Sequence, residues 1–513
     1  MEKINAQEWK KDLPLFEEKI KAFNNGEVSK NDYKGFSGLY GSYAQRDPKA
    51  NMLRLRMTAG VVTKEKLKFV ADTIQKYNVN KAHFTTCEAI QLHNLPYEDV
   101  PKIMEEALDV DIVTMGGGGD FPRNVMCSPL SGVDPDEYFD VAPYAKAAAE
   151  FLMGYIKAPK MPRKLKVCFS SSPKNVPHAT YRDLGFVARS DGKFDVYSAG
   201  GLGNNPKFGV LMAEAIDPSE ICYYIRAMYK TFVAYGNYQN RGKARTRYMQ
   251  EICGGPEAYR EKYLEKLAEV FEEGNDLHVY PEAKVITKAG DGEIEGRRIF
   301  KQKQDGLYAV AYHPIGGVPD LNTLVALARA VEAMEDVEMR LQPDEGTYIV
   351  NLTASEAKQI LDITESDSAQ SEFETSVACI GATICQVGLR DSQGLLHECV
   401  TAIREAGIKD GCLPQIHISG CPSSCGTHQT GIIGFRGFTK KVDGKPAPGF
   451  TLFAGGNDQQ GKETMGQELG VIAQSRIPEF LIELGKAVEN SGKTFMEWYS
   501  LEAVQKIAEP YVK

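Results

Sequence analysis

The sequence repeats itself at a constant spacing, and this repeat constrains the fold more than any other feature. The segment Met52–Val110 can be laid over the segment Ala309–Asp367 at an offset of 257 residues. The pairs that coincide are Gly60 with Gly317, Val61 with Val318, Phe84 with Leu341, Asn94 with Asn351, and Leu95 with Leu352. A repeat of this length indicates two copies of one structural unit.

Both copies have the same order of patterns. Each reads as a β-like run, a glycine turn, a helix with apolar spacings of three and four, a second β-like run and a second helix. This order predicts a small ferredoxin-like half-domain. The apolar helix positions are Leu67, Val70, Ala71 and Ile74 in the first copy and Leu324, Leu327, Ala328 and Val331 in the second.

A second, weaker repeat follows each half-domain. Residues 167–175 (VCFSSSPKN) match 416–424 (IHISGCPSS) at an offset of 249, and the same register brings Leu184-Gly185-Phe186 onto Ile433-Gly434-Phe435. Further on, VYSAGG (196–201) resembles TLFAGG (451–456). These matches predict two related α/β domains, although two unrelated α/β domains with similar strand–turn chemistry would also fit.

The predicted fold class is therefore a mixture of α+β and α/β with internal duplication. Two ferredoxin-like half-domains pair into one unit, and two α/β domains surround a pseudo-twofold junction where a cofactor could bind. The predicted segments are an N-terminal extension (1–50), half-domain 1 (51–115), α/β domain 1 (116–275), a linker (276–305), half-domain 2 (306–370) and α/β domain 2 (371–513).

Composition excludes several classes of protein. A net charge of −9 and a pI near 5.6 argue against nucleic-acid binding. The sequence contains no run of about 18 apolar residues, so it predicts no membrane span. The charged start has no apolar signal-peptide core. Eleven cysteines, an odd number, argue against a disulfide framework. We therefore expect a cytoplasmic protein with reduced thiols. Its clearest basic concentrations are Lys157–Lys166 and Arg241–Arg247.

Four spaced cysteines occur only in the second copy. Cys379 and Cys385 have the spacing C-x5-C, and Cys421 and Cys425 have the spacing C-x3-C. Four converging thiolates with glycine-rich loops suit an iron–sulfur cluster, whereas zinc favours shorter spacings. Burial in the core is the third interpretation of these four. It is also the expected role of the other seven: Cys87, Cys127, Cys168, Cys222, Cys253, Cys399 and Cys412.

The cysteine pattern and several longer motifs resemble the sirohaem-dependent sulfite and nitrite reductases. C-x5-C is followed some 35 residues later by GC-x3-C, within IHISGCPSSCGTHQTGIIGFRG. The resemblance implies that all four cysteines bind a [4Fe–4S] cluster and that Cys425 also bridges to the sirohaem iron. The other matching motifs are RLRMTAG (54–60), the FTT…IQLHN run (84–94), GDFPRNVMCSPLSGVD (119–134), MPRKLK (161–166), DLGF (183–186), GGLG (200–203) and NRGKAR (240–245).

The same resemblance implies two further groups of residues. The first would hold the eight carboxylates of sirohaem: Arg54, Arg56, Gln91, His93, Asn124 and the segment Arg241–Arg245, with Arg241 and Arg245 as its basic ends. The second is a cationic cage over the open face of the haem, formed by Arg123, Lys164 and Lys166. Because side chains of a strand repeat with period two, Lys164 and Lys166 are expected on one face.

One position departs from the family pattern. Where the family usually has arginine, this chain has Cys87, followed by Glu88. The cage therefore lacks one guanidinium and its bidentate contact to an anion. Either Cys87 lines the substrate pocket, or another arginine takes the missing place.

The leading hypothesis is a six-electron reduction of sulfite to sulfide, because both cage lysines resemble those of the sulfite enzymes. The alternatives are a ferredoxin-type nitrite reductase that forms ammonia, and a non-catalytic sirohaem electron-transfer or sensor protein. No nucleotide-binding glycine fingerprint is evident. Electrons are therefore expected from ferredoxin or a similar small carrier, with a small oxyanion as substrate and no nucleic acid or membrane as partner.

Overall fold

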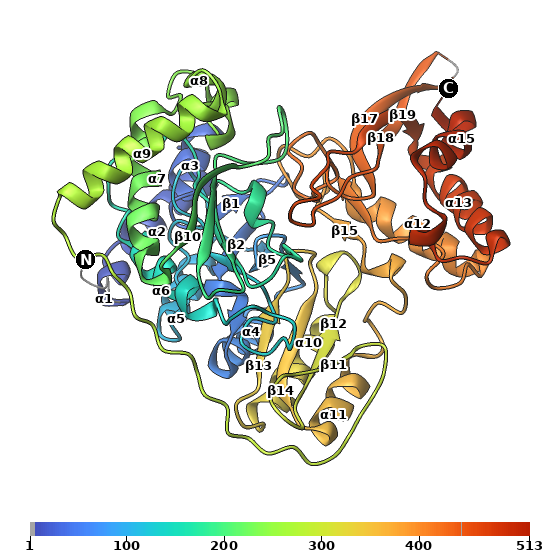
Figure 1. The fold of residues 1–513 in the computed structure, drawn as a ribbon, viewed down its shortest axis with the longest axis horizontal. Coiled ribbons are helices and arrows are strands. Elements are labelled where there is room, and N and C mark those ends of the chain that lie inside the picture. Colours follow the sequence, from blue (N-terminus) through green and yellow to red (C-terminus); the bar gives the residue numbers. More distant parts are fainter. Residues whose placement is uncertain (1–5, 443, 513) are drawn as a thin grey trace.

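The computed structural model describes residues 6–442 and 444–512. Residues 1–5 of the predicted N-terminal extension, and residues 443 and 513 of the predicted second α/β domain, lie outside the described residues. Four sheets and three large hydrophobic cores organise the chain. In Figure 1 the second half-domain forms a lower lobe, the second α/β domain a lobe at the right, and the first half of the chain the large lobe at the left. The predicted duplicated α+β and α/β architecture is confirmed.

The first half-domain carries three additional N-terminal helices. Their apolar side chains, including Trp9, Phe16 and Ile20, join the core beneath the sheet β1-β2-β5-β4. The elements are α1 (Ala6–Lys10), α2 (Leu13–Asn24), α3 (Lys30–Ser37), β1 (Ser42–Ala44), β2 (Asn51–Arg56), β3 (Val61–Val62), α4 (Lys64–Lys76), β4 (Lys81–Phe84), β5 (Ala89–Leu95) and α5 (Val100–Leu108).

The second half-domain repeats this arrangement and interlocks with the first. Strand β3 leaves its own half-domain and completes the sheet β11-β12-β14-β13-β3. Residues of both half-domains share one hydrophobic core, so the two form one unit. The elements are β11 (Ile299–Lys301), β12 (Tyr308–Tyr312), α10 (Leu321–Glu332), β13 (Glu338–Leu341), β14 (Thr347–Leu352) and α11 (Ala354–Thr364).

Equivalent hydrogen bonds show the duplication at the level of single residues. The backbone N–H of Asn94 donates to Gln45 Oε1 over 3.0 Å, and that of Asn351 donates to Gln302 Oε1 over 2.7 Å. Both asparagines adopt positive φ, 59° and 63°, a conformation that asparagine tolerates better than most residues. These pairs keep the offset of 257 that the sequence predicts.

The half-domains begin earlier than the predicted boundaries at 51 and 306. Strand β1 pairs with β2, and β11 pairs with β12, so each sheet gains an edge strand from the predicted extension or linker. Each edge strand has three residues, too few to show a periodic pattern. Between Gly274 and Arg298 the linker runs without helix or strand along the outside of the molecule (Figure 1).

The first α/β domain has the sheet order β10-β9-β8-β7-β6. Strands β6, β7 and β8 are parallel to one another, β9 is antiparallel to β8, and β10 is antiparallel to β9. The elements are β6 (Met126–Cys127), α6 (Ala142–Met153), β7 (Val167–Ser170), β8 (Leu184–Ala188), β9 (Phe194–Ser198), β10 (Val210–Ile216), α7 (Ile221–Tyr235), α8 (Met249–Ile252) and α9 (Pro256–Glu272).

The second α/β domain has the equivalent order β15-β16-β17-β18-β19. Val167 pairs with Leu184 in the first sheet and Ile416 pairs with Ile433 in the second, which keeps the offset of 249. The elements are β15 (Val377–Ala378), α12 (Ser392–Ala406), β16 (Ile416–Ser419), β17 (Ile433–Val442), β18 (Lys445–Ala454), β19 (Gln467–Ala473), α13 (Ile477–Ser491), α14 (Phe495–Trp498) and α15 (Leu501–Val512). None of the helices in the described ranges has the length and apolar content needed to cross a membrane.

Candidate active site

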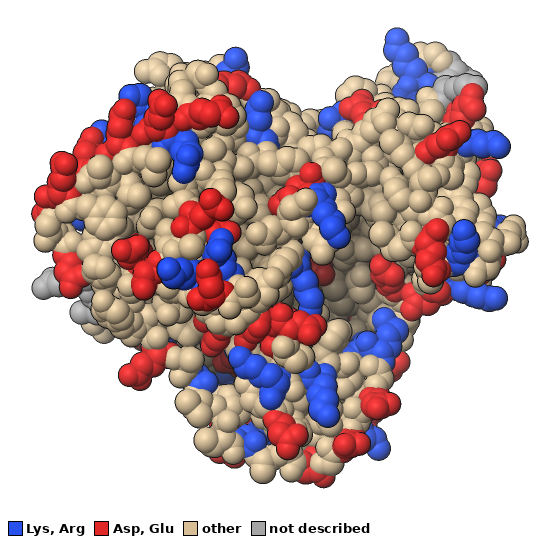
Figure 2. Space-filling view, viewed as in Figure 1, with Lys and Arg blue, Asp and Glu red and all other residues tan. Residues whose placement is uncertain are grey.

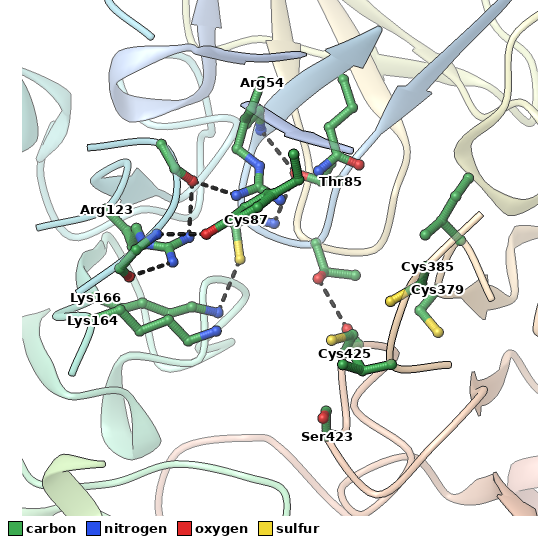
Figure 3. A pocket seen from close by; sticks show the side chains of 18 of the residues that line it. Arg54, Thr85, Cys87, Arg123, Lys164, Lys166, Cys379, Cys385, Ser423 and Cys425 are labelled. Carbon is green, nitrogen blue, oxygen red and sulfur yellow. Dashed lines mark hydrogen bonds between the residues drawn. The ribbon is translucent and has the colours of Figure 1, made fainter. Parts of the chain in front are cut away.

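One cavity of about 1170 Å³ lies where residues of both half-domains and both α/β domains meet. Figure 2 shows a hollow between the lobes in this part of the surface. Every site residue predicted from the sequence lines this cavity: Arg54, Arg56, Cys87, Gln91, His93, Arg123, Asn124, Lys164, Lys166, Arg241, Arg245, Cys379, Cys385, Cys421 and Cys425. In Figure 3 Arg123, Lys164 and Lys166 lie on one side of the space, and Cys379, Cys385 and Cys425 lie on the other.

Parallel strands bring two of the cysteine loops together. Strands β15 and β16 are parallel neighbours, so their carboxyl ends lie at one edge of the sheet. Cys379 directly follows β15, and Cys421 follows β16 after Gly420. The Gly420 N–H donates to Cys379 Sγ over 3.2 Å, as expected near a thiolate ligand. Burial and the neighbouring Cys425 raise the pKa of the Cys379 thiol to about 12.

All four cysteines line the cavity, and Cys425 is the most exposed of them. Its carbonyl accepts a 3.0 Å hydrogen bond from Thr86 Oγ1, which ties this loop to the first half-domain. No three His, Cys, Asp or Glu side chains of the described ranges come close enough together to bind a single metal ion. A four-iron cluster spreads its thiolates further apart, because each binds a different iron.

The loop of Cys385 is held by the turn between β1 and β2. The N–H of Arg46 donates to the carbonyl of Ile384 over 3.0 Å, and Arg46 Nη2 donates to that of Gly388 over 2.8 Å. From the opposite direction, Gln386 Nε2 donates to the carbonyl of Ala44. The first half-domain therefore positions a cysteine that lies 339 residues further along the chain than Arg46.

Two lysines project from the segment that enters β7. Leu165 is fully buried, whereas Lys164 and Lys166 on either side of it line the cavity. Figure 3 shows both ammonium groups pointing the same way, toward Cys87. Lys166 Nζ donates to Cys87 Sγ over 3.0 Å. The turn that carries Cys87 is fixed by Asn124, whose Nδ2 donates to the carbonyl of Cys87 over 3.1 Å.

The surrounding charges change the titration of these groups. Burial alone would raise the pKa of the Cys87 thiol, but Lys166 and Arg182 lower it to about 6. Burial, together with repulsion from Lys166, holds the pKa of Lys164 well below its usual range. Burial also lowers the pKa of Lys166, although the Cys87 thiolate opposes this effect. The cavity therefore holds a thiolate and two ammonium groups that release protons readily.

We expect Cys87 to be the most reactive thiol apart from the four spaced cysteines, Cys379, Cys385, Cys421 and Cys425. With a pKa of about 6, about nine-tenths of it is thiolate at pH 7, against a few per cent of an ordinary cysteine. Alkylation of cofactor-free protein, followed by peptide mass spectrometry, should show Cys87 reacting faster than the partly exposed Cys253, whose pKa burial raises. Its rate should level off above about pH 7. Lys166→Met should slow it; equal rates in both proteins would contradict the ion pair.

The remaining predicted side chains are largely committed to the protein. Arg56 is buried and donates to the carbonyls of Met115, Pro122 and Arg123, so it braces the cavity wall. His93 Nδ1 lies 3.1 Å from Gln45 Oε1 and is also buried.

Three other arginines of the cavity lining interact with neighbouring side chains. Arg54 donates two hydrogen bonds to the amide oxygen of Gln91, from Nη2 over 2.5 Å and from Nε over 3.0 Å, in the favoured orientation of the amide. Arg241 pairs with Asp120 at 2.6 Å, and Arg245 pairs with the buried Asp183 at 2.9 Å. Two of the predicted cations are therefore neutralised by carboxylates.

Four cations that line the cavity were not among the predicted site residues: Arg182, Lys34, Lys160 and Arg163. Arg182 lies two residues before β8 and lines the same cavity. It was overlooked because only the following DLGF matched a motif, and an isolated arginine carries no spacing signal.

Comparison with known proteins gives matches over most of the chain. The model of the domain described as "Nitrite/Sulfite reductase ferredoxin-like half domain" matches residues 43–110, and that of "Nitrite and sulphite reductase 4Fe-4S domain" matches residues 118–271. The first half of the chain therefore contains both domains of the nitrite and sulfite reductase family. These two matches cover the first copy, whereas the four spaced cysteines lie in the second copy, which has the same strand order.

Named relatives carry both activities of the family. The chain is 27% identical to the chloroplastic ferredoxin–nitrite reductase of Spinacia oleracea, over 79% of this chain and 69% of the spinach protein. It is 24% identical to sulfite reductase [ferredoxin] 1 of Mycolicibacterium paratuberculosis, over 92% of this chain and 89% of that protein. The solved structure of the Mycobacterium tuberculosis NirA protein has the same fold, with a TM-score of 0.79, 24% identity and coverage of 97% and 96%.

The residues that line the cavity fit sirohaem and a [4Fe–4S] cluster, the cofactors that the matched family implies. Eleven lysines and arginines line the cavity, against three acidic residues, although the whole chain has a net charge of −9. Arg123 Nε and Arg245 Nε are buried without a hydrogen-bond partner in the described structure. Such donors suit a ligand rich in carboxylates, because a buried donor without a partner is costly. The cysteine loops supply the thiols that a cluster requires.

Proposed function

We propose that the chain reduces sulfite to sulfide, with electrons supplied one at a time by ferredoxin or a similar carrier. The observation that carries this proposal is the pair Lys164 and Lys166, whose ammonium groups enter the cavity together opposite Cys425. Arg123 adds a third cation, and its guanidinium is fixed by the carbonyls of Gly117 and Gly119 at 2.9 and 2.8 Å. Such a fixed cationic site suits an anion with several oxygens.

The cage residues would act in two ways. Fixed cations bind the anion and stabilise negative charge as sulfur–oxygen bonds break. Each oxygen leaves as water and takes up two protons, which buried ammonium groups of lowered pKa can deliver. Sirohaem and the cluster, when bound, supply the path for six electrons. We propose Cys379, Cys385, Cys421 and Cys425 as the cluster ligands, with Cys425, which is exposed to the cavity, as the thiolate shared with the haem iron.

Reduction of nitrite to ammonia is the second candidate. Cys87 in place of the family's arginine leaves fewer fixed donors for a large, doubly charged anion, and the spinach relative is named for nitrite. The ferredoxin in the names of both relatives supports the proposed donor.

The test is a comparison of kcat/KM for sulfite and for nitrite, with reduced methyl viologen as donor. The protein should be prepared anaerobically and should contain one sirohaem and one [4Fe–4S] cluster per chain. We expect the larger kcat/KM for sulfite. A larger value for nitrite would replace the proposal with the second candidate. Full cofactor content without turnover of either anion would favour an electron-transfer or sensor protein.

A further inference from the structure

The cage has a gap at Cys87, and a partly buried arginine from another element lies beside this gap. Cys87 and Arg182 line the same cavity although they are 95 residues apart in sequence. Lys166 connects them, because its N–H donates to Asp183, the residue after Arg182, over 2.8 Å and its Nζ donates to Cys87 Sγ over 3.0 Å. In keeping with this arrangement, the positive charge of Arg182 lowers the pKa of Cys87 and that of Lys166. The three side chains therefore form one electrostatic group on the cationic side of the cavity.

Hydrogen bonds fix both the backbone and the side chain of Arg182. Its carbonyl accepts a 2.9 Å hydrogen bond from the N–H of Gly200, and its Nε donates to the carbonyl of Pro177 over 3.2 Å. Its Nη2 is buried and has no hydrogen-bond partner among the residues that the structure describes. A fixed guanidinium with an uncommitted buried donor is costly unless a ligand supplies the acceptor.

Arg182 also keeps its charge available. Arg241 and Arg245, which line the same cavity, are paired with Asp120 and Asp183. Arg182 forms no ion pair with a carboxylate of the described chain within 4.0 Å. The nearby carboxyl of Glu88 is fully buried, and burial raises its pKa well above the usual range, so it offers little negative charge.

We propose that Arg182 is the fourth cation of the anion-binding cage and takes the place of the arginine that the family has at position 87. The side chain of Cys87 is smaller than that of arginine, and Arg182, two residues before β8, lines the same cavity. In the pseudo-twofold copy the equivalent position is Gly431, where a Cβ atom would lie 2.5 Å from the His417 ring. The additional cation is therefore confined to the copy that carries the lysine pair. This proposal rests on the proposed reduction of a small oxyanion.

The test removes the cation and then returns it at the other position. Arg182→Gln should raise the KM for sulfite on the order of ten- to a hundredfold, because it removes a charge-assisted hydrogen bond. The same loss should appear in the anion concentration needed for the absorption change of oxidised holoenzyme. Arg182→Lys keeps the charge and should recover part of the affinity. The double variant Cys87→Arg/Arg182→Gln should return the KM to within severalfold of the original value. Arg189→Gln is the matched control, since Arg189 pairs with Asp191 and Asp195 on the surface.

Three results would overturn the proposal. One is an unchanged KM and anion affinity in Arg182→Gln. Another is a fall in sirohaem content at unchanged KM, which would make Arg182 a contact of the cofactor. The third is failure of the double variant to bind anion better than Arg182→Gln. If Arg182→Gln does not fold, the comparison of Arg182→Lys with the original protein decides the question by the same titration. Absence of turnover in the original protein would contradict the proposed function. The anion titration of the oxidised holoenzyme would still test the role of Arg182, because it does not depend on turnover.

Discussion

Replacing Cys425 by serine should abolish most turnover and change the haem spectrum. Cys425 is exposed to the cavity, opposite the cationic cage, and its loop is tied to the first half-domain through Thr86. If its thiolate joins the cluster to the haem iron, serine removes both a ligand and the electronic coupling. The loss should exceed the roughly 10- to 100-fold that removal of a second-shell partner costs a metal site. Steady-state turnover, iron content and the haem absorption spectrum measure it.

Two other cysteines provide controls for this experiment. Cys399 is on the buried side of α12, and Cys412 is buried in the same core. Cys399→Ser and Cys412→Ser should affect stability more than turnover, because a hydroxyl in an apolar core lacks a partner. A Cys425→Ser enzyme with full turnover and an unchanged spectrum would show that the ligand assignment is wrong. Loss of iron from Cys412→Ser alone would point to the same conclusion.

The repeats predicted the fold well because the two copies keep a constant residue offset even where their amino acids differ. Glu88 and Glu345 illustrate this, since both are buried at positive φ and each accepts a hydrogen bond from a strand N–H, of Cys127 and Ala378 respectively. The interlocking of β3 with β13 was not predictable. A two-residue strand has no period, and its partner belongs to the other copy.

The candidate site was predicted from motifs, and the structure adds what motifs leave out. Arg56 matched the family pattern, yet its donors are used by three backbone carbonyls. Arg182 matched nothing and still enters the cavity. Motifs identify residue types at family positions, whereas the free or committed state of a donor depends on neighbours far apart in the sequence.

Removal of either cage lysine should lower kcat/KM for sulfite on the order of ten- to a hundredfold. A buried charge-assisted hydrogen bond contributes roughly 1.5–3 kcal/mol, and about 1.4 kcal/mol corresponds to a tenfold change in rate. Lys164→Met should lower kcat, because burial and repulsion from Lys166 make this ammonium a ready proton donor. Lys174→Met is the control, since Lys174 pairs with Asp134 and Asp136 at the surface.

Lys166→Asn should distinguish the two anions. Sulfite carries more charge and more oxygens than nitrite, so loss of this cation should weaken sulfite turnover more than nitrite turnover. The variant also removes the partner of the Cys87 thiolate, whose Sγ lies 3.0 Å from Lys166 Nζ. The pKa of Cys87 should therefore rise, and a limb of the pH profile of kcat/KM near pH 6 should move to higher pH if the thiolate form is the active one. Equal losses for both anions with an unshifted profile would remove Lys166 from the substrate site and favour nitrite reduction or a non-catalytic role.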